Sequence, residues 1–328
     1  MRRERPPLSV YITIDTEAWP RGSEWREDHL NADIQRDIYG ETKEGAVGLK
    51  YQLDLFKTQD LRAIFFVEAL HTLAVGTSHL QEMIRIIQEY GQDVQAHPHP
   101  EWLQWISDKD LPPFKGPNLH DYTVPEQAQI VAKVAGILTE CGAKSVRSMR
   151  AGNFGASPDT LRALATIGMP IDFSMNLCAP DGRWSRENAP SACQPVQMEG
   201  VIEYPVSFFE DYPGHWRHAQ VCACSASELT RALECAYENG WSHFVIVFHT
   251  FELLKNRKVA GAIPRINGTV KRRFESLCRF LSDNRDRFQT EWTPEAEWKA
   301  PSGTPAPIQG DVWLTFGRYV EQAWNRLT

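Results

Sequence analysis

Short apolar runs of strand length alternate with amphipathic segments of helix length along most of this 328-residue sequence. The predicted strands, rich in β-branched and aromatic residues, are 8–14, 62–67, 92–97, 146–149 and 244–248. The predicted helices are 44–58, 79–90, 125–141, 157–167, 225 or 227 to 239, and 270–288. Repeated strand–helix alternation indicates parallel strands beneath a helical layer. The sequence therefore predicts an α/β barrel or an open parallel sheet.

The C-terminal region breaks this alternation. Residues 292–309 are rich in Pro, Gly and Ser and are predicted to form a linker, and 311–327 are predicted to form a helix. The apolar positions of that helix are Val312, Trp313, Phe316, Tyr319, Val320 and Trp324. We expect this helix to pack back on the barrel rather than to bind a partner. The predicted organisation is one domain over 1–291, followed by a linker and packed helix over 292–328.

Charge and composition exclude several classes of protein. The formal net charge of -7 argues against non-specific binding to nucleic acid or anionic lipid, which depends on a basic surface. The apolar run at 244–248 is far shorter than the roughly 20 residues of a membrane-spanning helix. The first apolar run is too short for a signal peptide, and Asp15 and Glu17 stand where a cleavage site would be. Seven cysteines without a CxxC pair fit a reducing compartment, so we expect a cytoplasmic protein.

Polar residues cluster where four predicted strands end, at 13–17, 97–101, 150–155 and 248–253. In parallel α/β folds the carboxyl ends of the strands share one edge, and binding and catalytic sites are built there. The sequence therefore predicts one site assembled from distant segments.

The spacing within two clusters suits a metal site. Asp15 and Glu17 are two residues apart, so both side chains project to the same face of an extended chain. One carboxylate can bind a metal while the other accepts a proton from water. His97 and His99 have the same spacing and make a good chelate. Pro98 lacks a backbone donor, which places the histidine pair at a strand exit.

Each of these residues also has a purely structural explanation. Asp15 and Glu17 can cap the following segment, Arg150 can form a structural salt bridge, and His249 can be a satisfied core histidine. Their joint placement, rather than any single member, indicates a site.

Other candidate residues and motifs give weaker evidence for a functional site. Cys222 and Cys224 lack further nearby ligands and are predicted to be buried cysteines, and His215 and His218 are predicted in a solvated aromatic loop. The sequence contains neither a phosphate-binding GxxxxGK or GxGxxG motif nor a GxSxG nucleophile elbow, so a serine hydrolase is disfavoured.

Taken in order, the clusters resemble the five motifs of the polysaccharide deacetylase family, also called the NodB-homology domain or carbohydrate esterase family 4. The matching stretches are 13–17, 97–101, 150–155, 171–174 and 247–249, and 64–67 resembles the family's TFFV strand. The ID-x-E and H-x-HPEW signatures are most similar to a bacterial branch called WalW-like. The resemblance covers roughly residues 8–290.

This resemblance implies a distorted (β/α) barrel with fewer than eight repeats, extended by the C-terminal helix. It also implies a metal-dependent hydrolase, most simply with Zn²⁺, that removes an N-acetyl or similar acyl group from a sugar or polysaccharide precursor. A cytoplasmic location favours a lipid- or nucleotide-linked precursor over finished cell wall. The oligomeric state is left open.

Matching positions imply residue roles. Asp15 would be the general base, held ionised and oriented by Arg150. The resemblance implies that Glu17, His97 and His99 hold the metal.

The remaining roles concern the leaving group and the substrate. His249 would be the general acid that protonates the leaving amine, tuned by Asp172. Trp19, Trp102 and Phe154 flank the motifs and would stack on a sugar ring.

The sequence departs from the family pattern in two places. Thr16 separates the base from its acidic neighbour, so that Glu17 takes the place of an adjacent carboxylate. The usual spacing of the two histidines is also changed, so either His99 or Glu101 can be the third ligand. We prefer His99, because imidazole suits zinc and Pro100 limits the turn that would bring Glu101 round.

Two other functions remain open. The altered ligand spacing is compatible with a non-catalytic carbohydrate-binding relative. A hydrolase of another non-peptide C–N bond, such as a deformylase, would use the same residues, because the size of the leaving acyl group is set by the shape of the pocket.

Overall fold

The computed structural model describes residues 5–18, 29–184, 191–256, 263–295 and 305–327. Its main sheet consists of β1 (Leu8–Thr16), β4 (Ile64–Val67), β5 (Asp93–Ala96), β6 (Ser148–Met149), β7 (Ile171–Asp172), β8 (Val196–Met198), β9 (Val201–Glu203), β12 (His243–His249) and β15 (Phe288–Thr290). The strand order is β12-β1-β4-β5-β6-β7-β9-β8, and β15 also pairs with β1. All pairs are parallel except β8–β9.

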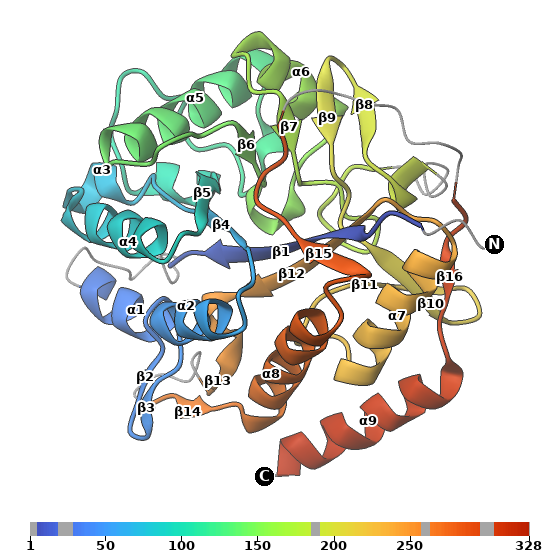
Figure 1. Cartoon of the computed structure of the whole chain (residues 1–328). Coiled ribbons are helices and arrows are strands. Elements are labelled where there is room, and N and C mark those ends of the chain that lie inside the picture. The colour runs from blue at the N-terminus through green and yellow to red at the C-terminus, as the bar shows by residue number, and fades with distance from the viewer. Residues whose placement is uncertain (1–4, 19–28, 185–190, 257–262, 296–304, 328) are drawn as a thin grey trace.

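Helices cover the outer side of this sheet, which curls into an incomplete barrel (Figure 1). They are α1 (His29–Asp37), α2 (Leu49–Thr58), α3 (Thr72–Val75), α4 (Ser78–Glu89), α5 (Val124–Glu140), α6 (Pro158–Thr166), α7 (Ala226–Glu238), α8 (Gly268–Asp283) and α9 (Val312–Leu327). In the described part of the chain, the end strands β12 and β8 do not pair with each other. The predicted distorted α/β barrel is confirmed.

Smaller strands lie outside this sheet. They are β2 (Glu41–Thr42), β3 (Gly45–Ala46), β10 (Phe208–Tyr212), β11 (His215–His218), β13 (Leu254–Lys255), β14 (Arg265–Ile266) and β16 (Ile308–Gln309). The β10–β11 hairpin includes His215 and His218, so the prediction of a solvated loop at these histidines is wrong. β16 pairs with β10 in the segment predicted to be a linker.

Alternation along β1 divides the core into two parts. Val10, Ile12 and Ile14 face the helices and belong to the large core cluster. Tyr11 faces the inside of the barrel, where its ring packs edge-on against Phe173 with the centroids 5.7 Å apart. Because side chains alternate along a strand, Thr13 and Asp15 also point into the barrel, and Asp15 lies near the carboxyl end of the sheet.

Two helix predictions are wrong at one end. The helix predicted over 44–58 starts only at Leu49, because the preceding residues form the β2–β3 hairpin, with Gly45 at a positive φ of 121°. The helix predicted over 270–288 ends at Asp283. Phe288 instead begins β15 opposite Leu8, where its side chain is buried.

The C-terminal helix α9 lies against the barrel through its polar face. Arg318 is buried, and its guanidinium donates to Asp211 Oδ2 at 2.8 Å and to Glu228 Oε1 at 3.0 Å. The apolar side chains of this helix point outward, with Trp313 78 % exposed and Trp324 67 % exposed. Buried ion pairs rather than apolar contacts orient the helix. The division into two units stays a prediction.

Replacing Arg318 with methionine should lower the free energy of unfolding by about 3 kcal/mol, because Glu228 and Asp211 then lose a buried cationic partner. Urea unfolding measures this change. Arg279→Met, at an exposed position on α8, is the control and should leave the midpoint unchanged. An unchanged midpoint for Arg318→Met would contradict the anchoring role of this arginine.

Among the residues that the structure describes, none of the helices has an apolar stretch long enough to cross a bilayer.

Candidate metal centre

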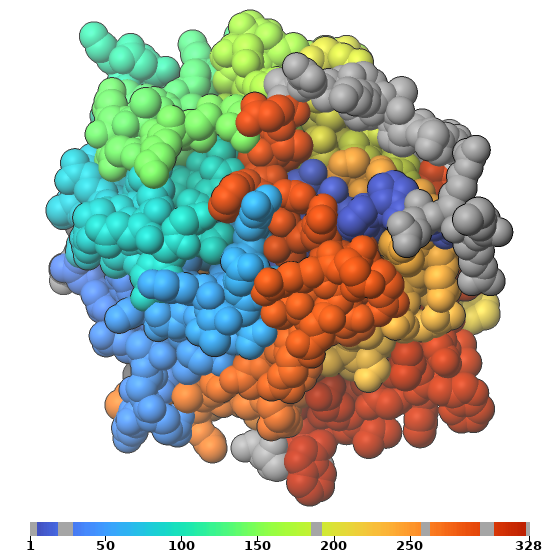
Figure 2. All heavy atoms as spheres, in the orientation of Figure 1, coloured from blue at the N-terminus to red at the C-terminus, as the bar shows by residue number. Residues whose placement is uncertain are grey.

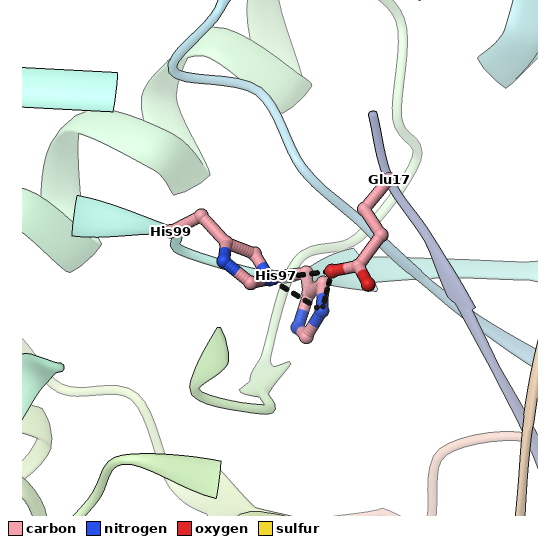
Figure 3. Close-up of side chains that lie close together, drawn as sticks. All are labelled: Glu17, His97 and His99. Carbon is pink, nitrogen blue, oxygen red and sulfur yellow. Dashed lines mark hydrogen bonds and ion pairs between the residues drawn. The ribbon is translucent and has the colours of Figure 1, made fainter. Parts of the chain in front are cut away.

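Three buried side chains converge at the carboxyl ends of β1 and β5. Glu17 follows β1, while His97 and His99 follow β5, and one ligand atom from each lies within 4.8 Å of the other two. Figure 3 shows the Glu17 carboxylate directed at both rings. His97 Nε2 is 2.9 Å from Glu17 Oε2 and 3.3 Å from His99 Nε2, and His99 Nε2 contacts the same carboxylate oxygen.

The other ring nitrogen of each histidine faces an acceptor. His97 Nδ1 lies 2.7 Å from the backbone oxygen of Arg150, which can only accept, so this nitrogen carries the hydrogen. His99 Nδ1 lies 3.1 Å from Glu101 Oε2, and Asn153 Nδ2 in turn donates to Glu101 Oε1 at 2.6 Å. Such partners orient metal-binding imidazoles and leave Nε2 available as the ligand.

This geometry separates the two candidates for the third ligand. Glu101 contacts the ring nitrogen of His99 that points away from Glu17, whereas His99 Nε2 joins the cluster. Glu101 is therefore placed to orient His99. One carboxylate and two imidazoles form a donor set that suits zinc and other first-row divalent metals, so the residues present fit the metal that the resemblance implies.

Charges in this cluster are strongly coupled. Burial of Glu17 raises its pKa, but His99 and His97 together hold it well below its usual range. Burial of His99 lowers its pKa, but Glu17 and Glu101 raise it well above its usual value. A buried carboxylate requires a positive partner. Here either a protonated imidazole or a bound cation supplies it.

Asp15 lies beside this cluster and is held by Arg150. Arg150 Nη1 donates to Asp15 Oδ1 at 2.7 Å, and both side chains are buried. Arg150 Nε also donates to the backbone oxygen of Phe173 at 3.2 Å, and its guanidinium lies 4.6 Å above the ring of Phe66. A charge-assisted pair held at several points orients the carboxylate.

His249 ends β12 directly opposite Asp15 in the sheet register. Its Nε2 lies 3.5 Å from Asp15 Oδ2, and its Nδ1 lies 2.7 Å from Glu252 Oε1. Burial lowers the pKa of His249, but the hydrogen bond and charge of Glu252, with smaller contributions from Asp15 and Glu17, raise it to about 9. The imidazole is therefore protonated at neutral pH.

The partner of His249 differs from the expected one. Asp172 accepts a hydrogen bond from Ser174 Oγ at 2.6 Å and shares a hydrogen bond with Glu203, and burial raises its pKa. The prediction that Asp172 tunes His249 is therefore wrong, and Glu252 has that position. Sequence reasoning missed Glu252, although its place three residues after His249, in a short helical turn at the strand end, was an available signal.

The three aromatic candidates have different surroundings. Trp19 lies outside the described residues. Trp102 is fully buried, with its ring 5.8 Å from that of His71, so the prediction that it stacks on a sugar is wrong. Phe154 is half-buried beside the Arg150 guanidinium, 5.6 Å away, in a turn where Asn153 and Phe154 both have positive φ. Such strained backbone is frequent at functional sites.

Comparisons with known proteins support the fold. No protein-family model matches the sequence, and no curated protein matches it closely enough to count as a relative. A putative polysaccharide deacetylase from Mycobacterium smegmatis is similar in structure, with 16% identity, a TM-score of 0.53, and 92% of this chain and 97% of that chain covered. A 4-alpha-glucanotransferase from Thermococcus litoralis is similar over 98% of this chain and 46% of that chain, with 9% identity and a TM-score of 0.51.

The chain thus has the fold of the polysaccharide deacetylases, as its motifs indicate. Its assignment to the WalW-like branch stays a prediction. The same fold also resembles part of a glucanotransferase, so the fold alone does not name the reaction, which has to be argued from the side chains at the site.

Proposed function

We propose that this chain is a metal-dependent hydrolase that removes an N-acetyl or similar small acyl group from a sugar or polysaccharide precursor. The observation that carries the proposal is the position of Asp15. It lies between Arg150 and His249, at the strand ends that also hold the Glu17, His97 and His99 cluster. A base, an acid and a set of metal ligands on one edge of the sheet are the groups that amide hydrolysis requires.

Glu17, His97 and His99 would hold the metal, which we propose to be zinc. When bound, a divalent metal polarises a carbonyl and lowers the pKa of water, so that hydroxide is available near neutral pH. Within the chain, the Arg150 backbone oxygen and Glu101 keep the two imidazoles in the tautomer that offers Nε2.

Asp15 acts as the general base. The hydrogen bond from Arg150 fixes Oδ1, which leaves Oδ2 to accept a proton from the attacking water. The water oxygen then forms a bond to the acyl carbon.

His249 acts as the general acid. It carries a proton at neutral pH and donates it from Nε2 to the amine nitrogen as the C–N bond breaks. The products are a carboxylate and a free amine. Its distance of 3.5 Å from Asp15 supports action of both groups on one substrate.

Release of acetate from N-acetylated sugar oligomers by the zinc-loaded protein tests the proposal, and removal of metal with a chelator should stop the release. Zinc-loaded protein that binds such oligomers without releasing acetate would favour the non-catalytic relative. The cytoplasmic location stays a prediction.

Replacing Glu252 with glutamine should shift the high-pH limb of the activity profile to lower pH by about one to two units. His249 must be protonated to donate, so activity falls as pH rises through its pKa. Loss of the Glu252 charge lowers that pKa from about 9 toward its usual value.

The readout of this experiment is kcat/KM against pH. Glu140→Gln, at the exposed end of α5, is the matched control and should leave the profile unchanged. A Glu252→Gln profile that keeps the wild-type high-pH limb would contradict the role given to Glu252.

A further inference from the structure

The outward face of α9 is unusually apolar for a surface helix. Its large side chains are between 48 % and 78 % exposed, and they are Val312, Trp313, Phe316, Tyr319, Val320 and Trp324. Figure 2 shows α9 in red at one edge of the molecule. A helix on the surface of a monomer normally turns its apolar stripe to the core. In α9 this arrangement is reversed.

The orientation of α9 about its own axis is set by polar contacts with the barrel. Arg318 is buried between Asp211 and Glu228, and Arg273 Nε donates to Glu321 Oε2 at 2.9 Å on the next turn. These contacts occupy the polar face of the helix. Rotation that would bury the tryptophans would break them, so the apolar face is held outward.

The outward face has a symmetric spacing. Trp313, Gly317, Val320 and Trp324 are separated by four, three and four residues, so the pattern has the same spacing from either end. This spacing places all four on one seam of the type that packs helices against each other. A Cβ added at Gly317 would meet no atom within 4 Å, so this glycine leaves room for the close approach of another backbone.

We propose that α9 joins two copies of this chain, packed antiparallel about a two-fold axis that passes between Arg318 and Tyr319. In this arrangement Trp313 packs against Trp324 of the partner subunit, and Gly317 packs against Val320 of the partner subunit. A two-fold interface uses the same surface on both subunits, and a face with symmetric spacing meets that requirement.

The size of the face supports this occupant. Buried aromatic side chains contribute 150–250 Å² each, so the exposed parts of this face offer roughly 600–700 Å² per copy. Specific interfaces bury about 600–1,000 Å² per partner. Apolar patches on monomers are mostly smaller, at about 300–600 Å². Two copies of this face therefore reach the area that a specific dimer needs.

The charges on α9 favour a second copy of the chain, rather than a lipid surface, as the partner of its outward face. Helices that bind membranes in the plane of the interface are rich in Lys and Arg on their polar face. In α9 the polar face is occupied by the barrel, and the one basic side chain described on it, Arg318, is buried in ion pairs. The net charge of -7 further disfavours anionic lipid.

The molar mass of the full chain in solution, measured by light scattering across micromolar concentrations, tests the proposal. Wild-type protein should have the mass of a dimer, and the double variant Trp313→Glu with Trp324→Glu should dissociate at least about 100-fold more readily, as expected for the loss of central aromatic contacts. Phe114→Glu, an exposed aromatic away from α9, is the control and should remain dimeric. Circular dichroism checks that each variant is folded.

A pair of complementary variants tests the antiparallel register. Gly317→Glu and Val320→Lys should each be monomeric alone, because each homodimer would bury unpaired charges. Mixed in equal amounts they should form a heterodimer, because Glu and Lys then face each other once and the native glycine–valine contact is kept. A wild-type chain that stays monomeric, a double variant that dimerises as wild type does, or a mixture that stays monomeric would overturn the proposal. A monomer that binds phosphatidylcholine vesicles through α9 would also overturn it.

Discussion

Asp15→Asn should lower kcat about 10³–10⁴-fold, the effect expected when an oriented base is removed. Asparagine has nearly the same shape as aspartate and can still accept the hydrogen bond that Arg150 donates to Oδ1. Its amide cannot take a proton from water. The neighbouring Glu17, His97 and His99 cluster keeps its three ligands, so the metal content should be close to that of the wild type. The melting temperature should fall, because the buried Arg150 loses its anionic partner.

The measurement is steady-state turnover together with metal analysis of the same samples. Asp286→Asn, an exposed position after α8, is the matched control and should keep full activity. An Asp15→Asn variant that retains a large part of wild-type turnover with metal bound would contradict the assignment of the base.

His97→Ala should abolish stoichiometric binding of zinc, and with it turnover. The substitution removes one of three ligands and leaves Glu17 and His99 without the imidazole that contacts both. Glu101 cannot replace the lost imidazole, because it faces the other ring nitrogen of His99. Loss of activity in this variant should therefore resist added zinc, whereas chelator-treated wild type should recover when zinc is returned.

Thermal unfolding gives a readout that does not depend on turnover. A metal that binds only the folded chain stabilises it, by about 2.7 kcal/mol when the free metal is 100 times its dissociation constant. Zinc should raise the melting temperature of the wild type and of His79→Ala, a control on α4, but not of His97→Ala. A wild type unaffected by zinc, or a His97→Ala variant stabilised as strongly as the wild type, would contradict the metal assignment.

Much of the fold could be predicted from local patterns. The run at 8–14 has the composition of a buried strand, and it forms β1, which lies between β12 and β4 in the sheet. Because parallel strands end on one edge, placing polar clusters at strand ends was enough to expect that Glu17 and His97 come together. Strand β15 was missed, because three residues after a long helix carry too little periodicity to separate them from it.

Contacts between distant segments could not be predicted in the same way. The sequence indicates that α9 is amphipathic, but the choice of its buried face depends on Asp211 and Glu228, which lie far away in the chain. Likewise, the choice between Asp172 and Glu252 as the partner of His249 depends on where the chain turns after β12. The hydrophobic periodicity of a sequence describes a single helix or strand. The buried face of α9 and the partner of His249 depend instead on which elements pack against them.

The most direct test of the account is the anomalous diffraction of crystals grown with zinc. We expect a strong anomalous peak about 2.0–2.2 Å from one oxygen of Glu17 and from Nε2 of both His97 and His99, the distances usual for zinc ligands. The Asp15 carboxylate should lie next to that peak without being displaced from Arg150. Crystals with zinc bound elsewhere, and no peak among these three side chains, would contradict the account.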